Sequence, residues 1–502
     1  MNRRDFLKHA GSCAVLIGLS ASFARGAEVT PRKPRHILWL MCDQYRHDAF
    51  GFAGDKHVPT PTFDKLAAQG MYLRQTYCQF ALCVPSRTAL ALGRYAKSTG
   101  VFDNHADAPR NQESLYQILR THGVTTQYFG KLHVNNRDDL DWNNPDGELT
   151  TRARDQEGGQ GDYGVMTKKV EETFEWDAKE KTIAFMKKHA SESWFLYCSL
   201  IRPHPPRLAP LESWKRVDQH LVVEDLRNIV EHYPYVPHSA RNNVDAQEEK
   251  RAELMALQNM MKKLPLQPVS GRRKNGPLSD PEALQSSFGC IMAYYGMIHF
   301  VDALFGEVLT ALDQLGLRND TLVIFNADHG ELLDEHRLWA KQQFYEHSVR
   351  VPLIVSWPGV VPEGKVSDAL IQSIDLYPTL LDFLGLPVPK TVQGKSFMPL
   401  LTGVTEHHQT VVYSELENGK VMQFDGRYKW IDNGASAPEV YDMTNDPWEI
   451  KNLATLPEFR ERMDAKKKEL RQWLATDAVP QSPITKTDKK ADRRKKRESS
   501  GK

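Results

Sequence analysis

Apolar runs and helical patterns alternate along the main part of this chain. Five runs of about seven residues are almost continuously apolar, which is the pattern of strands covered on both faces. They are residues 36–42, 124–130, 194–200, 321–327 and 351–357. Helical patterns lie between them at residues 62–69, 113–121, 167–189 and 293–315. This alternation predicts an α/β fold with a large, mostly parallel sheet flanked by helices.

The pattern changes in two places. Residues 212–285 are polar, helix-prone and interrupted by Pro, which indicates an insertion over one end of the sheet within a main domain of residues 34–403. In residues 404–475, short β-like pieces precede one amphipathic helix near 457–474. We therefore expect a small C-terminal α+β subdomain with an antiparallel sheet.

Both ends of the chain are basic and are not expected to belong to the fold. Residues 1–27 place Arg3 and Arg4 before a weakly apolar stretch and several small residues, which is typical of a twin-arginine signal peptide. This signal predicts passage through the twin-arginine translocase, to the periplasm or to the outside of the cell. Residues 476–502 have nine Lys and Arg against three Asp and Glu from Thr485 onward, and predict a disordered basic tail. An anchor for a polyanion is the sharper alternative for this tail.

Composition excludes several classes of protein. With 40% hydrophobic residues the chain can bury a large core, and six Cys in 502 residues do not make a disulfide scaffold. Lys and Arg number 65 against 64 Asp and Glu, so nucleic acid is not an expected partner. This balance is a sum over unlike parts, because two basic ends conceal an acidic body.

Polar residues follow four of the predicted strands at the point where each strand ends. In open α/β sheets, ligands bind at the carboxyl ends of the strands, so we expect these side chains to meet. An oxygen-rich set with one imidazole suits Ca²⁺, Mg²⁺ or Mn²⁺, whereas zinc prefers more nitrogen and sulfur. The residues are Asp43 and Gln44, then Lys131 and His133, then His204, and finally Asp328 and His329.

A fifth element, residues 81–94, predicts an anion site at a helix start. Pro85 suits the first turn of a helix and Gly93 its end, so we expect Cys83 just before the helix N-terminus. Free backbone N–H groups and the positive end of the helix dipole favour an anion there. Arg87, one turn further on, can direct a guanidinium group at the same anion.

These residues resemble a known family. Cys83, Pro85, Ser86 and Arg87, followed by Leu90 and Gly93-Arg94, are similar to the motif C-x-P-S-R-x-x-L-x-x-G-R of the formylglycine-dependent type I sulfatases, in the alkaline phosphatase superfamily. Blocks in family order follow: HVPTPTFDKLAAQG, GKLH, RPHPP, ADHGELLDEHRLWAK, RVPLIV and VYDMTNDPWEIKNLA. The resemblance spans about residues 35–455 and implies an alkaline-phosphatase-like sandwich, with residues 34–403 as the sulfatase catalytic domain.

The resemblance also implies roles for individual residues. Cys83 would be oxidised to Cα-formylglycine by a maturation enzyme, and one hydroxyl of its hydrate would attack sulfur. The implied metal ligands are Asp43, Gln44, Asp328 and His329, together with modified Cys83. The implied sulfate-site and acid–base residues are Arg87, Lys131, His133, His204 and Lys341, with His336 as a less secure substrate-binding position. We expect His204 to protonate the leaving oxygen, shared with Lys341, and His133 to act as base in the second step.

Three positions depart from the commonest family pattern. Gln44 stands where many members have Asp, His329 where many have Asn, and Leu92 where Thr is frequent. The first two lower the negative charge of the metal site and leave the metal open between Ca²⁺ and Mn²⁺. Ca²⁺ is the first expectation, with Mn²⁺ or Mg²⁺ as the alternatives.

The expected activity is hydrolysis of sulfate monoesters by an exported enzyme, with a sulfated carbohydrate as first substrate class and small esters such as choline or aryl sulfate next. A phosphonate or phosphate mono- or diester hydrolase on the same scaffold is the alternative. A non-catalytic polyanion-binding protein is a second alternative. The natural substrate, exo or endo action and the oligomeric state stay open.

Overall fold

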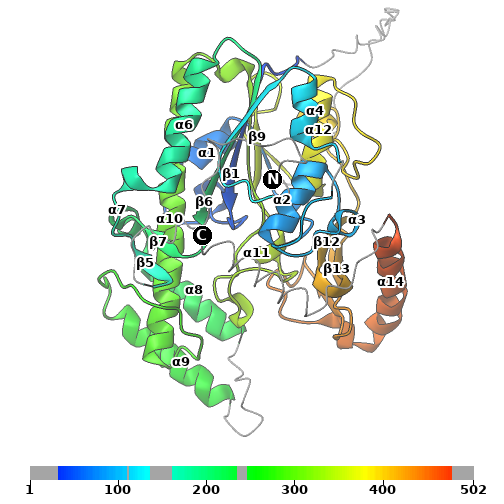
Figure 1. Cartoon of the computed structure of the whole chain (residues 1–502). Coiled ribbons are helices and arrows are strands. Elements are labelled where there is room, and N and C mark those ends of the chain that lie inside the picture. Colours follow the sequence, from blue (N-terminus) through cyan, green and yellow to red (C-terminus); the bar gives the residue numbers. More distant parts are fainter. Residues whose placement is uncertain (1–31, 110–111, 136–160, 234–245, 478–502) are drawn as a thin grey trace, which may run out of the picture. The chain divides into compact units, whose positions relative to one another are not determined.

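A computed structural model describes residues 32–109, 112–135, 161–233 and 246–477. The predicted signal peptide and nearly all of the predicted tail lie outside these residues. The central sheet has seven strands in the order β10-β2-β9-β8-β1-β6-β4, and β1 lies between the middle strand β8 and β6 (Figure 1). Their bounds are β1 His36–Asp43, β2 Met71–Leu73, β4 Thr125–Gly130, β6 Trp194–Pro203, β8 Thr321–Ala327, β9 Leu353–Ser356 and β10 Lys365–Ser367.

The mostly parallel sheet of the sequence analysis is confirmed, with one strand reversed. β9, predicted as residues 351–357, pairs antiparallel with both β8 and β2. Two short strands, β2 and the edge strand β10, were not predicted, because three residues are too few to show a pattern.

Alternate residues of β1 enter two different cores, one on each face of the sheet. Leu38, Leu40 and Cys42 pack into the core that includes α6 and α10, whereas Ile37, Trp39 and Met41 pack into the core that includes α2, α4 and α12. A strand buried on both faces explains the continuous apolar run. The helices in these two layers are α1 Pro61–Ala68, α6 Phe174–Lys188 and α10 Pro281–Gln314, and opposite them α2 Cys83–Leu92, α4 Leu115–Thr121 and α12 Leu376–Leu384.

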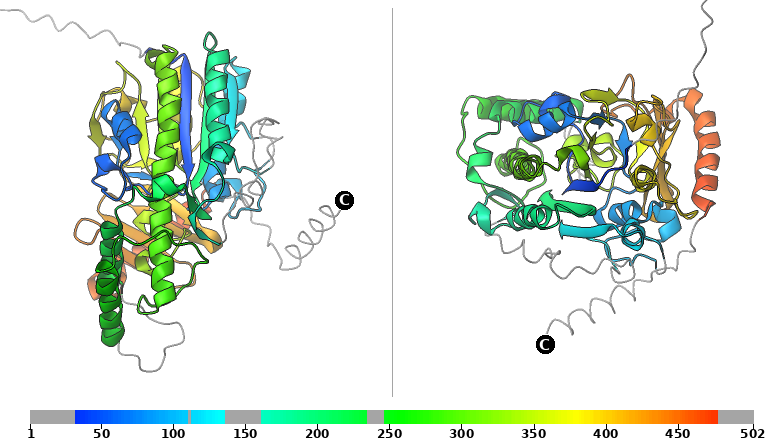
Figure 2. Two further views of the ribbon diagram at one scale, coloured as in Figure 1. Left: turned by 90° about the vertical axis from the view of Figure 1, so that its left-hand side faces the viewer. Right: turned by 90° about the horizontal axis from the view of Figure 1, so that it is seen from above.

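Helix α10 is longer than the sequence pattern predicted. It has 34 residues, and Asp280 caps it by accepting from the N–H groups of Glu282 and Ala283, just before Pro281. By length and composition α10 could cross a membrane, but 89% of its most apolar window is buried inside the protein, as in a core helix. The segment before it forms α7 Leu211–Trp214, α8 Gln219–His232 and α9 Ala246–Met261, and Figure 2 shows α9 beside the lower part of α10.

The C-terminal part forms an antiparallel sheet in the order β12-β13-β14-β15, with α14 packed on it. The bounds are β12 Val412–Leu416, β13 Lys420–Phe424, β14 Tyr428–Asp432, β15 Glu439–Asp442 and α14 Pro457–Ala475. This sheet joins the main sheet region where the N–H of Glu415 donates to the carbonyl of Gln79 at 2.8 Å. The remaining elements are β3 Thr76–Tyr77, β5 Tyr163–Val165, β7 Arg207–Ala209, β11 Ile371–Gln372, α3 Ala96–Thr99, α11 Glu346–Val349 and α13 Met398–Leu401.

Candidate active site

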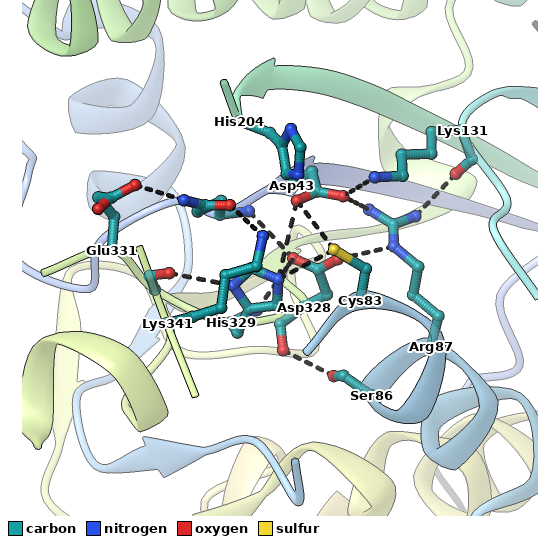
Figure 3. A network of polar contacts seen from close by, with 12 residues as sticks. Asp43, Cys83, Ser86, Arg87, Lys131, His204, Asp328, His329, Glu331 and Lys341 are labelled. Atoms are coloured by element: carbon teal, nitrogen blue, oxygen red, sulfur yellow. Dashed lines mark hydrogen bonds and ion pairs between the residues drawn. The ribbon is translucent and has the colours of Figure 1, made fainter. Parts of the chain in front are cut away.

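Four buried side chains meet at the carboxyl end of the central strands. Asp43 ends β1, Asp328 and His329 directly follow β8, and Cys83 begins α2. Their ligand atoms all lie within 4.8 Å of one another (Figure 3). Cys83 Sγ lies 3.6 Å from Asp43 Oδ1 and 3.2 Å from His329 Nε2. The expectation that these strand ends converge is therefore fulfilled in the geometry.

Local sequence fixes the position of Cys83. Leu82 is extended, the helix begins at Cys83, and Gly93 ends it in the left-handed region with φ 63°. The thiol thus lies at the positive end of a helix dipole. Burial and Asp43 would raise the pKa of Cys83, but Lys131, Lys341 and His329 lower it well below its usual range. The side chains around residue 83 therefore stabilise negative charge there.

Arg87 connects the nucleophile helix to both carboxylates. Its Nε donates to Asp328 Oδ2 at 2.7 Å, and its Nη2 lies 3.3 Å from Asp43 Oδ2. Nη1 donates to the carbonyl of Lys131 at 2.7 Å and to Ser199 Oγ at 3.0 Å. A guanidinium held in such a fork has a fixed plane and direction.

The two carboxylates have opposite pKa shifts. Burial would raise the pKa of Asp43, but Lys131, His204 and Arg87 lower it well below its usual range. Burial and the neighbouring Asp43 raise the pKa of Asp328. Two buried carboxylates this close favour a cation between them, since like charges in a dry site destabilise each other.

His329 is oriented as metal-binding histidines commonly are. Its Nδ1 lies 3.0 Å from the carbonyl of Gly330, so Nδ1–H donates there and the Nε2 lone pair faces the cluster. Carboxylate oxygens, one imidazole and the nearby amide oxygen of Gln44 form a donor set that fits a hard divalent cation. The residues present therefore fit the expected metal.

Gln44 is held in place by Glu331, which sequence reasoning did not single out. Gln44 has φ 66°, and its N–H donates to Asp328 Oδ1 at 3.0 Å. Its side-chain Nε2 donates to Glu331, which leaves its Oε1 toward Lys341. Glu331 is fully buried and accepts from Arg207 at 2.7 Å. Arg207 overcomes the effect of burial and lowers the pKa of Glu331 to about 2. The only sequence signal for Glu331 was its place inside the matched ADHGELL block.

Three of the expected sulfate-site residues belong to the polar network around the cluster, and His133 is described separately. Lys131 contacts Asp43, Lys341 contacts Gln44, and His204 lies in the same network (Figure 3). Burial and Lys341 lower the pKa of His204 to about 4, and its Nδ1 lies 2.6 Å from the carbonyl of Pro205. His204 is therefore a neutral imidazole with Nε2 as acceptor. His133 has φ 51°, and its buried Nδ1 has no hydrogen-bond partner within the described ranges.

His336 lies at the tip of the same loop as Lys341 and packs between aromatic rings. It stacks on Tyr345 with 3.6 Å between ring centroids and lies 4.2 Å from the ring of Tyr233. Burial lowers its pKa to about 3. The contacts described for His336 are thus with these rings rather than with the buried cluster.

A nucleophile at a helix start, a cation-binding carboxylate pair and three fixed cations define a hydrolase centre for anionic esters. Residues 35–386 match the sulfatase family model, and residues 334–476 match the model for the C-terminal region of N-sulphoglucosamine sulphohydrolase. The chain belongs to the sulfatase family, and its activity is that of a sulfuric ester hydrolase.

Named relatives agree with this class, and solved structures agree with the fold. The chain is 27% identical to arylsulfatase K of Canis lupus familiaris, over 87% of this chain and 82% of the relative. It is 25% identical to choline-sulfatase of Rhizobium meliloti, over 86% and 84%. Its fold is similar to that of the phosphonate monoester hydrolase of Agrobacterium radiobacter, with TM-score 0.69 and 22% identity over 91% of this chain and 99% of that chain. It is also similar to BT4656, solved with its substrate D-glucosamine-2-N,6-O-disulfate, with TM-score 0.66 and 20% identity over 88% and 97%.

Proposed function

We propose that this protein is an exported sulfatase that hydrolyses sulfate monoesters of a saccharide, using formylglycine at position 83 and a divalent cation, Ca²⁺ first. The observation that carries the proposal is the buried contact of Cys83 Sγ with Asp43 and His329, 3.6 and 3.2 Å away, beside Arg87. The family name of the model that matches residues 334–476 supports a saccharide as substrate. The Arg3-Arg4 pair supports export to the periplasm or beyond.

The buried cations supply charge stabilisation. When bound, the cation and the hydrated formylglycine would provide a nucleophilic hydroxyl of lowered pKa and neutralise sulfate oxygens. Asp43, Gln44, Asp328 and His329 would hold the cation. Arg87 stands in a fixed direction at the nucleophile, where charge on the sulfate oxygens grows in the transition state. Lys131 and Lys341 provide further positive charge from opposite sides of the cluster (Figure 3).

The protonation states distribute the proton transfers among these residues. Neutral His204, with its Nδ1 turned to Pro205, has no Nε2 proton to give in the resting enzyme. We therefore assign protonation of the leaving oxygen to Lys341, and His204 can accept a hydrogen bond from the product hydroxyl once that proton has been transferred. This differs from the sequence expectation, which put His204 first. His133 keeps its expected role as base, and its buried Nδ1 without a hydrogen-bond partner in the described structure is consistent with that task.

Mass spectrometry and kinetics test the mechanism together. The tryptic peptide that contains residue 83 should have the mass of formylglycine in protein purified from cells with a maturation enzyme. That protein should hydrolyse 4-nitrophenyl sulfate, and Cys83→Ala should abolish the activity while the melting temperature stays near wild type. Full activity with an intact thiol would refute the mechanism. Chelation followed by addition of Ca²⁺, Mn²⁺ or Mg²⁺ identifies the cation, and restoration by none of them would refute metal dependence.

A second candidate function is hydrolysis of phosphonate monoesters. Two solved structures with TM-scores of 0.69 and 0.70 carry the name phosphonate monoester hydrolase, which favours it. The discriminating measurement is kcat/KM for 4-nitrophenyl sulfate against 4-nitrophenyl phenylphosphonate on the same preparation. A higher value for the sulfate supports our proposal, and a higher value for the phosphonate replaces it.

A further inference from the structure

Three consecutive cations occupy the loop between α9 and α10, and they have different partners. Lys274 is neutralised, because its Nζ lies 2.9 Å from Asp280 and 2.9 Å from Glu282. Arg273 donates to the side-chain oxygen of Asn275, and in the described chain neither Arg273 nor the exposed Arg272 has a carboxylate at ion-pair distance. Arg273 therefore makes no ion pair within the described residues, and its charge acts at longer range on the buried carboxyl of Asp334.

The backbone of this loop is tied firmly to neighbouring segments. The N–H of Arg273 donates to Asp162 Oδ2 at 3.0 Å, and the N–H of Asp162 donates to the carbonyl of Gly271 at 2.7 Å. The N–H of Lys274 donates to Ser286 Oγ at 2.9 Å. A Cβ on Gly161 would lie 2.2 Å from the oxygen of Gly271, so the two strands of chain are in close contact. These hydrogen bonds fix the backbone position of Arg273.

Two sets of contacts connect the loop that carries Arg273 to the candidate active site. The guanidinium of Arg273 lies 5.3 Å from the ring centroid of Trp339, two residues before Lys341, and two residues span at most about 7 Å. Arg207 lies 5.1 Å from the same ring and pairs with Glu331, which holds Gln44. The N–H of Arg207 also donates to the carbonyl of Asp162 at 2.7 Å. Arg273 therefore lies beside the loop that carries Lys341.

We propose that Arg273 is a second anion subsite, which binds a further sulfate or carboxylate of the substrate while the scissile sulfate lies at residue 83. The proposal rests on the sulfatase function and narrows it to polyanionic saccharides. An ester with a cationic tail, such as choline sulfate, would be repelled at this place. If the contact with the Trp339 ring were its only role, Arg273 would be a packing residue. The two roles differ in what a mutation does to ligand preference.

Inhibition constants measure that preference whether or not the ligand is turned over. The matured enzyme hydrolyses 4-nitrophenyl sulfate in the presence of inorganic sulfate, choline sulfate, or a heparin-derived disaccharide with an N-sulfate and a 6-O-sulfate. The variants are Arg273→Gln, Arg273→Lys and the matched control Lys274→Gln, each checked by its melting curve. The informative quantity is the ratio of the inhibition constant of inorganic sulfate to that of the disaccharide.

The disaccharide should inhibit wild type more strongly than either small ion. Arg273→Gln should lower the ratio about tenfold, which equals about 1.4 kcal/mol. Arg273→Lys should retain most of the ratio, Lys274→Gln should leave it at the wild-type value, and added salt should reduce it in wild type more than in Arg273→Gln. An equal ratio in wild type and Arg273→Gln, or preference of wild type for choline sulfate, overturns the proposal. Matured wild type that hydrolyses no sulfate ester overturns the sulfatase proposal itself, and the subsite with it.

Discussion

Glu331→Gln separates the role of a buried carboxylate in stability from its role in orienting a metal ligand. In the native protein Glu331 pairs with Arg207 at 2.7 Å, and both side chains are almost fully buried. Its pKa of about 2, against 4.5 for an ordinary Glu, corresponds to about 3 kcal/mol of stabilisation of the charged form. Breaking a buried ion pair typically costs about 3–5 kcal/mol. The two estimates agree, so the free energy of unfolding at pH 7 should fall by about 3 kcal/mol.

The same change should weaken metal binding. Glu331 accepts from Gln44 Nε2 and so keeps Gln44 Oε1 on the side of Lys341. Arg207 and Gln44 both donate to Oε2 of Glu331, whereas Oε1 accepts from the N–H groups of Leu333 and Ala340. A glutamine at 331 therefore places its NH₂ group against donors in either orientation. When that group takes the Oε2 position, Gln44 turns its amide, and its oxygen leaves the cluster. Loss of such a supporting contact typically costs roughly 10- to 100-fold in metal affinity.

Chelator titration of the hydrolysis rate, with urea unfolding beside it, measures both effects. The matched control is Glu335→Gln, because Glu335 lies in the same loop and pairs with Arg46 at 3.1 Å without contacting Gln44. We expect both variants to lose stability and only Glu331→Gln to lose metal at lower chelator concentration. Equal metal affinity in the two variants would refute the orienting role of Glu331.

Three further predictions concern other charged groups, two of them outside the candidate active site and one, Arg87, within it. His57 lies between Asp55 and Asp225 at 2.9 Å each, which raises its pKa to about 10 against burial, so its stabilisation is full below pH 6.5 and fades as pH rises toward 10. Urea unfolding should show His57→Gln about 1–3 kcal/mol less stable at pH 6.5 and nearer to wild type at pH 9.5, and a constant difference would contradict this. Burial raises the pKa of Glu415 to about 8. The contribution of its protonated form to the free energy of unfolding is therefore lost as pH rises through 8. Between pH 5 and 9, Glu415→Gln should lose less stability than wild type does. Arg87→Lys, which cannot reproduce the fork to Asp328 and the carbonyl of Lys131, should lower kcat roughly 100-fold with retained fold by circular dichroism, and a loss under threefold would exclude a transition-state role.

The sequence predicted those parts of the site that depend on where strands and helices end. Asp43 and Asp328 follow apolar runs that form adjacent strands, so their meeting follows from the fold. Cys83 follows from the helix start before Pro85. Periodicity reports burial and not direction, which is why the reversal of β9 was missed. Hydrophobic periodicity also does not mark where a helix begins when its N-terminal half is as apolar as the rest. This is why the start of α10 after Asp280 was not predicted.

The loop that carries Glu331 and Lys341 was beyond prediction for a different reason. Six of its non-glycine residues have positive φ between 333 and 342, and no glycine lies among them to announce the turns. The loop is held by tertiary contacts instead, such as Arg337 to Glu253 at 2.8 Å and Asp334 to Ser287 at 2.9 Å. Strained backbone of this kind persists only where the surrounding structure fixes it, and it is frequent at functional sites. The place of His336 against Tyr345 follows from this loop geometry, so a histidine in a suggestive sequence block was a weak guide to its contacts.

Charge at the site explains why an acidic body can attract an anionic substrate. Among the buried groups, Arg87, Lys131 and Lys341 are opposed by Asp43 and Asp328, and two of the three cations are already in contact with those carboxylates. The protein side chains alone are therefore only slightly positive. A divalent cation held by Asp43 and Asp328 would leave the lysines and Arg87 in excess over a monoanionic sulfate ester. Attraction of the substrate thus depends on the metal and, in our proposal, on Arg273, which makes no ion pair within the described residues.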